Sequence, residues 1–368
     1  MYFSSHQKIA LVLLLVGMIL IVPIFLSFKG MDTPLDVQDA KPNETLSTST
    51  SSEVVISDDH KGTSTESSST TSQTQNKAPE AIKNTVELPP PTAQLLSTMR
   101  LTFNENFNEL SRYVDQSGNI TCEPGGRGIW QSVYHFCSRT IAPNYDSQLY
   151  IDQNFIDHVN QSGFGTTTTR NSTWVDNGIL TIEVKPSDEV IKKAAGAWAK
   201  YTSGLLTTQF SFSQHYGYFE MRAQVPTGDG IWPAFWLLPV DKSWPPEIDV
   251  MESFGGLNRK GEGGNYKIHY ASHTKDPKGL CGTWFSTGVD ITAGFHSYGV
   301  NWQPDGITYY FDGAPYASCP PNPDGNQPFY MLVNVAVGSE PSWSGMPTNA
   351  NTWPKYMYVD YVRAYQNK

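Results

Sequence analysis

The feature that most constrains the fold is a succession of short β-branched and aromatic runs from about Met99 onward. Gly, Asn, Asp and Pro separate these runs, and Asp312-Gly313 after one of them is a hairpin signal. Only residues 187–199 show a helix-like period. Many strands with little helix predict an all-β protein, a sandwich or a barrel. The clearest predicted strands are residues 178–184, 218–225, 266–270, 308–311, 330–335 and 357–362.

The aromatic residues divide the chain into unequal parts. None occurs between Phe28 and Phe103, and all ten tryptophans lie from Trp130 onward. A Ser/Thr-rich segment without aromatic residues cannot bury enough apolar surface to offset the entropy of an ordered chain. We therefore predict three parts: an N-terminal segment (1–29), a disordered Ser/Thr/Pro-rich linker (30–98) and a globular domain (99–368).

The N-terminal segment contains 20 uncharged, mostly apolar residues, Ile9 to Phe28. About 20 such residues suffice for a membrane-spanning helix. A signal peptide is the alternative, although its apolar stretch is usually shorter, about 7–15 residues. Both interpretations export the rest of the chain. The localisation we expect is therefore membrane-anchored with the globular domain outside the cytoplasm, or secreted.

Charge and cysteine content narrow the possible partners. The 25 Lys and Arg residues against 35 Asp and Glu residues give a formal net charge of −10, which argues against nucleic-acid binding. The four cysteines are an even number, as disulfides in an oxidising compartment require. Three pairings are open, and free buried thiols are a further alternative. We expect Cys122–Cys137 and Cys281–Cys319.

The segment Pro245 to Ser253 places three carboxylates among apolar residues in a predicted strand. Side chains alternate faces along a strand, so Glu247 and Asp249 share one face. Glu252 joins that face only if one extra residue bulges out of the strand. Bulges are favoured near active sites because they re-aim a side chain. The sequence therefore predicts a β-bulge near Val250-Met251.

Three crowded acids suit the cleavage of a glycosidic bond. One carboxylate attacks the anomeric carbon and a second carboxyl group protonates the leaving oxygen. A third acid between them can hold a proton, because like charges raise one another's proton affinity. A solvated acidic edge strand and a calcium site are the alternatives. Calcium fits poorly, because it needs several oxygen ligands from flexible loops.

An aromatic strand precedes the acidic one. Alternation places Trp232, Ala234 and Trp236 on one face, and Phe235 and Leu237 on the other. Sugar rings present C–H groups that pack on aromatic faces. We therefore expect Trp232 and Trp236 to bind substrate as a stacking platform beside the acids, with core tryptophans as the alternative.

An ordered set of motifs within residues 99–368 resembles glycoside hydrolase family 16. The six-residue form Glu-x-Asp-x-x-Glu resembles its laminarinase-like branch and bacterial exopolysaccharide endo-β-glycanases, and the phrase around it favours the succinoglycan-depolymerase type. The motifs that carry the resemblance are Tyr216-Gly217-Tyr218-Phe219-Glu220-Met221-Arg222, Trp232-Pro233-Ala234-Phe235-Trp236-Leu237-Leu238-Pro239, Trp244-Pro245-Pro246-Glu247-Ile248-Asp249-Val250-Met251-Glu252, Phe295-His296-Ser297-Tyr298-Gly299-Val300-Asn301-Trp302 and Met357-Tyr358-Val359-Asp360-Tyr361-Val362-Arg363.

This resemblance implies a concanavalin-like jelly roll of two curved antiparallel sheets, with a cleft across the concave face. It implies retention of anomeric configuration, with Glu247 as nucleophile, Asp249 as its supporting acid and Glu252 as acid/base. The substrate would be a β-glucan or exopolysaccharide with β-1,3 or mixed β-1,3/β-1,4 linkages. No catalytic cofactor or catalytic metal is implied, and the protein would act as a monomer.

Further contacts follow from strand faces and from the resemblance. We expect Arg222, His269 and Asn334 to contact substrate; a structural ion pair is the alternative for Arg222, and a structural role for His269. Asp360 could hold a structural calcium ion, as in some members of the family.

Two other functions compete with hydrolysis by an endo-β-glycanase. A transglycosylase using the same site would remodel envelope or capsule polysaccharide. A carbohydrate-binding sandwich without turnover is the third possibility, although binding alone needs no protonated carboxyl group.

Overall fold

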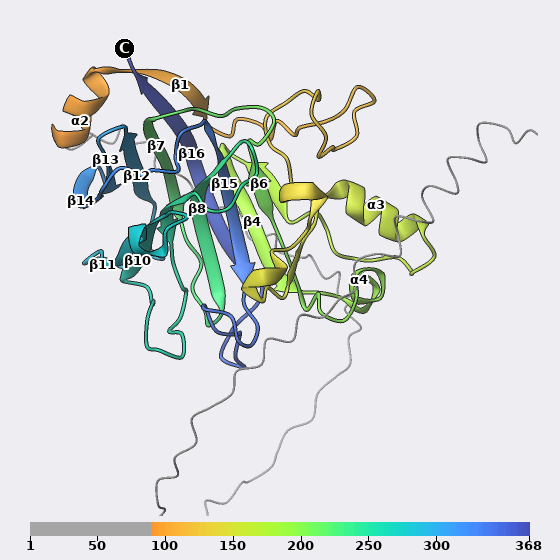
Figure 1. The fold of residues 1–368 in the computed structure, drawn as a ribbon. Coiled ribbons are helices and arrows are strands. Elements are labelled where there is room, and N and C mark those ends of the chain that lie inside the picture. The colour runs from red at the N-terminus through yellow and green to blue at the C-terminus, as the bar shows by residue number, and fades with distance from the viewer. Residues whose placement is uncertain (1–89) are drawn as a thin grey trace, which may run out of the picture. The chain divides into compact units, whose positions relative to one another are not determined.

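The computed structural model describes residues 90–368, which form two packed β-sheets (Figure 1). Among these residues no helix has the length and apolar character that crossing a bilayer requires. The predicted membrane segment and most of the predicted linker lie outside the described residues. The expectation of a two-sheet β-sandwich is confirmed.

The larger sheet has ten strands, and all of its pairs except the parallel β2–β5 are antiparallel. β1 joins its central strand β16, and β3 pairs with β4. In the order of the sheet, its strands are β14 (Ala314–Cys319), β13 (Gly306–Phe311), β12 (His296–Gln303), β7 (Gly217–Gln224), β16 (Lys355–Asn367), β4 (Ile179–Pro186), β5 (Tyr201–Ser203) and β2 (Gln148–Tyr150), with β1 (Met99–Glu105) and β3 (Thr173–Asp176) beside this path.

The smaller sheet has six antiparallel strands and carries both the acidic and the aromatic sequence motifs on neighbouring strands. Its order is β11 (Cys281–Ser286), β10 (Lys267–His273), β9 (Glu247–Glu252), β8 (Ile231–Pro239), β15 (Phe329–Val337) and β6 (Leu205–Thr207).

The core lies between the two sheets. On β8 the alternation is as predicted: Phe235 and Leu237 are fully buried against residues of the larger sheet such as Phe219 and Met221. Ala234 and Trp236 pack on the other side, in a separate cluster. Each large apolar side chain buried in this way contributes about 1.5–3 kcal/mol, so the core fixes which face of β8 looks away from it.

Short helices border the sheets. They are α2 (Pro90–Ser97), α3 (Gln153–Gln161) and α4 (Glu189–Ala195), with 3₁₀ turns at His135–Cys137, Ala142–Asn144 and Pro277–Gly279. α4 lies within the predicted helix-like stretch 187–199. Ile156 of α3 and Ile191 of α4 share a small apolar cluster. Figure 1 shows the two helices to the right of β4.

One helix lies within the predicted linker. Residues 90–97 were expected to belong to the linker, but they form α2. Leu95 and Leu96 of this helix pack against Tyr218 and Tyr310 of the larger sheet. This contact stabilises a helix that is too short to form by itself in water.

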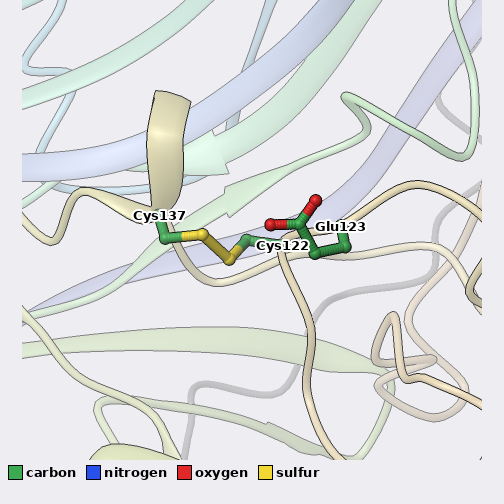
Figure 2. A group of neighbouring side chains, drawn as sticks. All are labelled: Cys122, Glu123 and Cys137. Atoms are coloured by element: carbon green, nitrogen blue, oxygen red, sulfur yellow. A yellow bond between two sulfur atoms is a disulfide. The ribbon is translucent and has the colours of Figure 1, made fainter. Parts of the chain in front are cut away.

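Both expected disulfides are present, and the four cysteines are all paired. Cys281–Cys319 joins β11 to β14 and so links an edge of the smaller sheet to an edge of the larger one. Figure 2 shows the bond between the sulfur atoms of Cys122 and Cys137, with the Glu123 side chain beside it. Because this bond occupies both sulfur atoms, these three residues do not form a metal site.

Candidate active site

A β-bulge in β9 brings the three acids to one side of the smaller sheet. Phe235 of β8 pairs with Met251, and the next residue of β8, Trp236, pairs with Asp249, so Val250 is the extra residue. The register with β10 shifts at the same place. The predicted bulge is confirmed. Without it, the two-residue period would turn Glu252 into the core.

The acids line a cleft of 740 Å³ on the side of the smaller sheet that faces away from the core. Trp232 and Trp236 line it as well, together with His269, His273 and Asn334. A segment far upstream, within residues 134–146, forms another part of its wall. The remaining lining residues with an aromatic or charged side chain are Tyr134, His135, Phe136, Asp146, Trp244 and Trp343.

Glu247 and Asp249 form a tightly coupled pair. Burial raises the pKa of Asp249 well above its usual range, and the charge of Glu252 raises it further. Burial and the charge of Asp249 likewise raise the pKa of Glu247. The Asp249 side chain, 4% exposed, is more deeply buried than that of Glu247, 14% exposed. The two carboxyl groups are hydrogen-bonded to each other, so one proton is retained between them.

Hydrogen bonds orient the carboxyl group of Glu247. The indole Nε1 of Trp244 donates to Glu247 Oε2 at 3.0 Å. Nε2 of His273 lies 3.7 Å from Glu247 Oε1 and 2.9 Å from Asp249 Oδ2. Glu247 thus keeps one oxygen bound to an indole and the other toward His273 and the cleft.

Glu252 is oriented in a similar way at the other end of the bulge. Nε1 of Trp232 donates to Glu252 Oε1 at 2.9 Å, and Nδ1 of His269 lies 3.2 Å from Oε2. Because Trp232 can only donate, Oε1 acts as an acceptor there. Oε2 is therefore the oxygen that can carry a proton to a substrate.

Trp232 and Trp236 hold polar groups in addition to lining the cleft. They are only 9% and 8% exposed, and Trp236 Nε1 donates to Asn334 Oδ1 at 2.7 Å. The ring of Tyr134 stacks on Trp236 at 5.9 Å between centroids. Substrate stacking on these two indoles stays a prediction. Among the described residues of the cleft, Trp244 (63%) and Phe136 (79%) expose far more aromatic surface.

The structure brings His269 and Asn334 to the cleft but leaves Arg222 outside it. Arg222 lies on β7 of the larger sheet, and its Nη1 donates to Asp360 Oδ2 at 2.6 Å. The expected substrate contact of Arg222 is therefore corrected to the alternative, a structural ion pair. The pair also uses the Asp360 carboxylate, so the expectation of a calcium ion at Asp360 gains no support.

The sequence did not predict the part of the cleft wall that lies within residues 134–146. Tyr134 stacks on His135 at 4.3 Å, and His135 Nε2 forms a hydrogen bond with the hydroxyl of Tyr330 on β15. Burial, together with the charge of Lys242, lowers the pKa of His135 to about 4. No motif in the sequence connects residues 134–136 to acids more than 100 positions downstream. The position of Trp244 in the cleft could have been predicted, because Trp244 lies three residues before Glu247 in the sequence.

Comparisons with known proteins place this site in a family. The sequence model of glycosyl hydrolases family 16 matches residues 160–363. Two endo-1,3-1,4-beta-glycanases of Rhizobium meliloti, ExsH and EglC, are each 36% identical over 272 residues, or 73% of this chain. The match covers 52% of each, so the chain spans about half the length of these curated relatives.

Solved structures show the same fold. The catalytic domain of an endo-1,3-beta-glucanase (laminarinase) from Thermotoga petrophila superposes with a TM-score of 0.54 at 26% identity. The superposition covers 73% of this chain and 98% of the laminarinase domain. Because the family match spans more than half of the sequence and includes both the bulged acidic strand and the tryptophan strand beside it, the chain belongs to glycosyl hydrolases family 16.

Proposed function

We propose that the chain is a retaining endo-β-glycanase that hydrolyses internal β-1,3 or mixed β-1,3/β-1,4 glucosidic linkages of an extracellular polysaccharide. The observation that carries the proposal is the bulged strand β9, with Glu247 and Glu252 in one cleft and each bound by an indole N–H. The activities named for the relatives support the linkage types.

In the first step Glu247, as a carboxylate, attacks the anomeric carbon. Glu252 donates its proton to the glycosidic oxygen, and the bond from that oxygen to the anomeric carbon breaks. A glycosyl group is then covalently attached to Glu247. In the second step Glu252 removes a proton from water, the water oxygen attacks the same carbon, and Glu247 leaves as a carboxylate.

Asp249 keeps Glu247 ready for attack. Two like charges in contact cannot both remain ionised in a buried site, so one proton is retained between them. With the proton on Asp249, Glu247 is a carboxylate that can accept hydrogen bonds from Asp249 and from Trp244 Nε1. These bonds hold its attacking oxygen in place without neutralising it.

We further propose that this chemistry takes place outside the cytoplasm. Two disulfides are typical of oxidising compartments. The apolar segment Ile9–Phe28 would provide either an anchor or an export signal.

The test is to incubate the purified full-length chain with laminarin, lichenan and succinoglycan. Proton NMR of the first products should show the β-anomer, and viscosity should fall faster than reducing ends appear, as internal cleavage requires. First products of α-configuration would exclude double displacement. Oligomers longer than the donor would favour a transglycosylase, and binding without any product would favour a carbohydrate-binding sandwich.

A further inference from the structure

His273 stands opposite Glu247 in the register between β10 and β9, and it contacts both members of the coupled acid pair. Its Nε2, Glu247 Oε1 and Asp249 Oδ2 converge on one point of the cleft. One donor atom from each of the three residues lies within 4.8 Å of the other two. In the mechanism above, His273 has no role, so this convergence needs a separate explanation.

We propose that Glu247, Asp249 and His273 form a binding site for a zinc-like divalent cation, which inhibits the enzyme by occupying the attacking carboxylate. Zinc bonds to imidazole nitrogen and carboxylate oxygen are about 2.0–2.2 Å long, so ligand atoms of a tetrahedral site lie about 3.3–3.6 Å apart. The Nε2–Oδ2 and Nε2–Oε1 distances of 2.9 and 3.7 Å bracket that value. Small side-chain rotations therefore suffice to admit the ion.

The donor set selects the class of metal. Calcium requires six to eight oxygen ligands, and magnesium requires an octahedron of oxygens at about 2.0–2.1 Å. One imidazole nitrogen with two carboxylate oxygens suits zinc, copper, nickel or cobalt instead. All three residues line the open cleft, so the fourth position is left for water or a sugar hydroxyl.

The surroundings favour a cation. Glu252 adds a third acid to the same cleft. Trp244 Nε1 holds Glu247 Oε2 and leaves Oε1 turned toward His273. A bound cation would replace the repulsion between the carboxylates by attraction to both.

Metal binding is measured first, on the chelator-treated full-length chain, by calorimetric titration with ZnCl2. We expect a strong site with one Zn²⁺ per chain that is lost on His273→Gln, with an affinity loss beyond the roughly 10- to 100-fold caused by removing an outer partner of a metal ligand. Glu247→Gln should weaken binding as well, which keeps the test decisive if His273→Gln misfolds. With Co²⁺ alone, intense visible absorption typical of tetrahedral nitrogen and oxygen ligands should appear and should vanish in His273→Gln.

Two matched variants serve as controls. His269→Gln changes the other histidine on the same strand face, which contacts Glu252 and lies outside the three-atom cluster. His296→Gln changes a histidine paired with Asp312 on the larger sheet. Both should bind Zn²⁺ with the affinity of the unaltered chain. Unchanged binding by His273→Gln, or the absence of a stoichiometric site in the unaltered chain, would overturn the proposal.

Inhibition is measured separately and rests on the proposed function. Zn²⁺ should lower the kcat/KM for laminarin, and EDTA should reverse the effect. Zinc binding without glucan hydrolysis would refute the proposed function and leave the metal site standing. Hydrolysis that Zn²⁺ does not affect, in a chain that binds no Zn²⁺, would refute only the metal site.

Discussion

Each sheet of the sandwich buries an acidic residue, and the two residues differ in what surrounds them. Glu220 on β7 is 2% exposed and accepts hydrogen bonds from Tyr218 at 2.6 Å and Tyr361 at 2.8 Å. Asp249 on β9 is 3% exposed and has Glu247 and Glu252 as neighbours. Burial is the largest cause of a raised pKa in both.

The difference teaches that burial alone does not make an acid reactive. Around Glu220, two hydroxyl donors offset the cost of burial, so the group is a satisfied part of the core. Around Asp249, the charge of Glu252 adds to that cost, and one proton is retained between Asp249 and Glu247. The crowded acids on β9 therefore lower the stability of the smaller sheet, whereas Glu220 does not lower the stability of the larger sheet in this way.

The largest effect that would separate the two acidic sites is expected from Glu247→Gln. Losing the nucleophile should lower kcat on laminarin on the order of 10⁴-fold or more. The midpoint of thermal unfolding should stay equal or rise, because one of the crowded carboxyl groups is gone. Steady-state kinetics and calorimetry check both parts. A variant that hydrolyses laminarin at the original rate would remove Glu247 from the mechanism.

Glu220→Ala should show the opposite pattern. It leaves the hydroxyl groups of Tyr218 and Tyr361 without their buried acceptor, at a cost of about 3 kcal/mol in the free energy of unfolding. The kcat of the folded variant should change less than about threefold. Urea unfolding measures the first value, and Glu220→Gln is the matched control with a smaller loss. A large fall in kcat at unchanged stability would contradict the structural role of Glu220.

Asp146 is a buried acid with too few hydrogen-bond donors around it, so it allows the cost of such burial in the free energy of unfolding to be measured. It is 9% exposed, its Oδ1 has no hydrogen-bond partner among residues 90–368, and burial raises its pKa from 3.8 to about 6. The folded chain therefore retains a proton that the unfolded chain has released, so stability falls as pH rises from about 4 to about 6 and stays lower above that range.

Asp146→Asn should consequently raise the free energy of unfolding at pH 8 by about 2 kcal/mol, given about 1.4 kcal/mol for each pKa unit and some loss of hydrogen bonding. At pH 4 the gain should disappear. Chemical unfolding at the two pH values checks this expectation. An equal gain at both would show that the charge of Asp146 is not the cause.

Arg222→Gln should have the smallest effect. The Arg222–Asp360 pair is partly exposed, and pairs of this kind are worth about 1 kcal/mol or less. Because Arg222 lies on the larger sheet outside the cleft, the KM for laminarin should stay the same. A tenfold rise in KM would restore Arg222 as a substrate contact and blur the distinction between the two sheets.

Much of the site could be predicted because strand periodicity is a local rule. The two-residue period placed Glu247 and Asp249 together, and it showed that Glu252 could join them only through a bulge, which the register confirms. The same rule placed Phe235 and Leu237 in the core. The expected disulfide pairing, one of three that four cysteines allow, is present in the structure.

Other parts could not be predicted. Strand periodicity predicts which residues lie on the same face of a strand, but it does not predict which residues pack against that face. Arg222 shares a strand face with Glu220, and nothing in the strand tells whether a cleft or Asp360 lies over it. The helix α2 depends on contacts of Leu95 and Leu96 with strands more than 100 residues away.

By itself, the sequence determined an all-β domain with a bulged strand that presents three acids. Alternation of side chains along an extended backbone requires only the residues of that strand. Only the tertiary structure decided that Tyr134 and His135 close the cleft, that Trp232 binds Glu252, and that His273 reaches the coupled acids. Those contacts join segments that are distant in the sequence. Their geometry depends on the order of the strands in the smaller sheet and on the register between neighbouring strands.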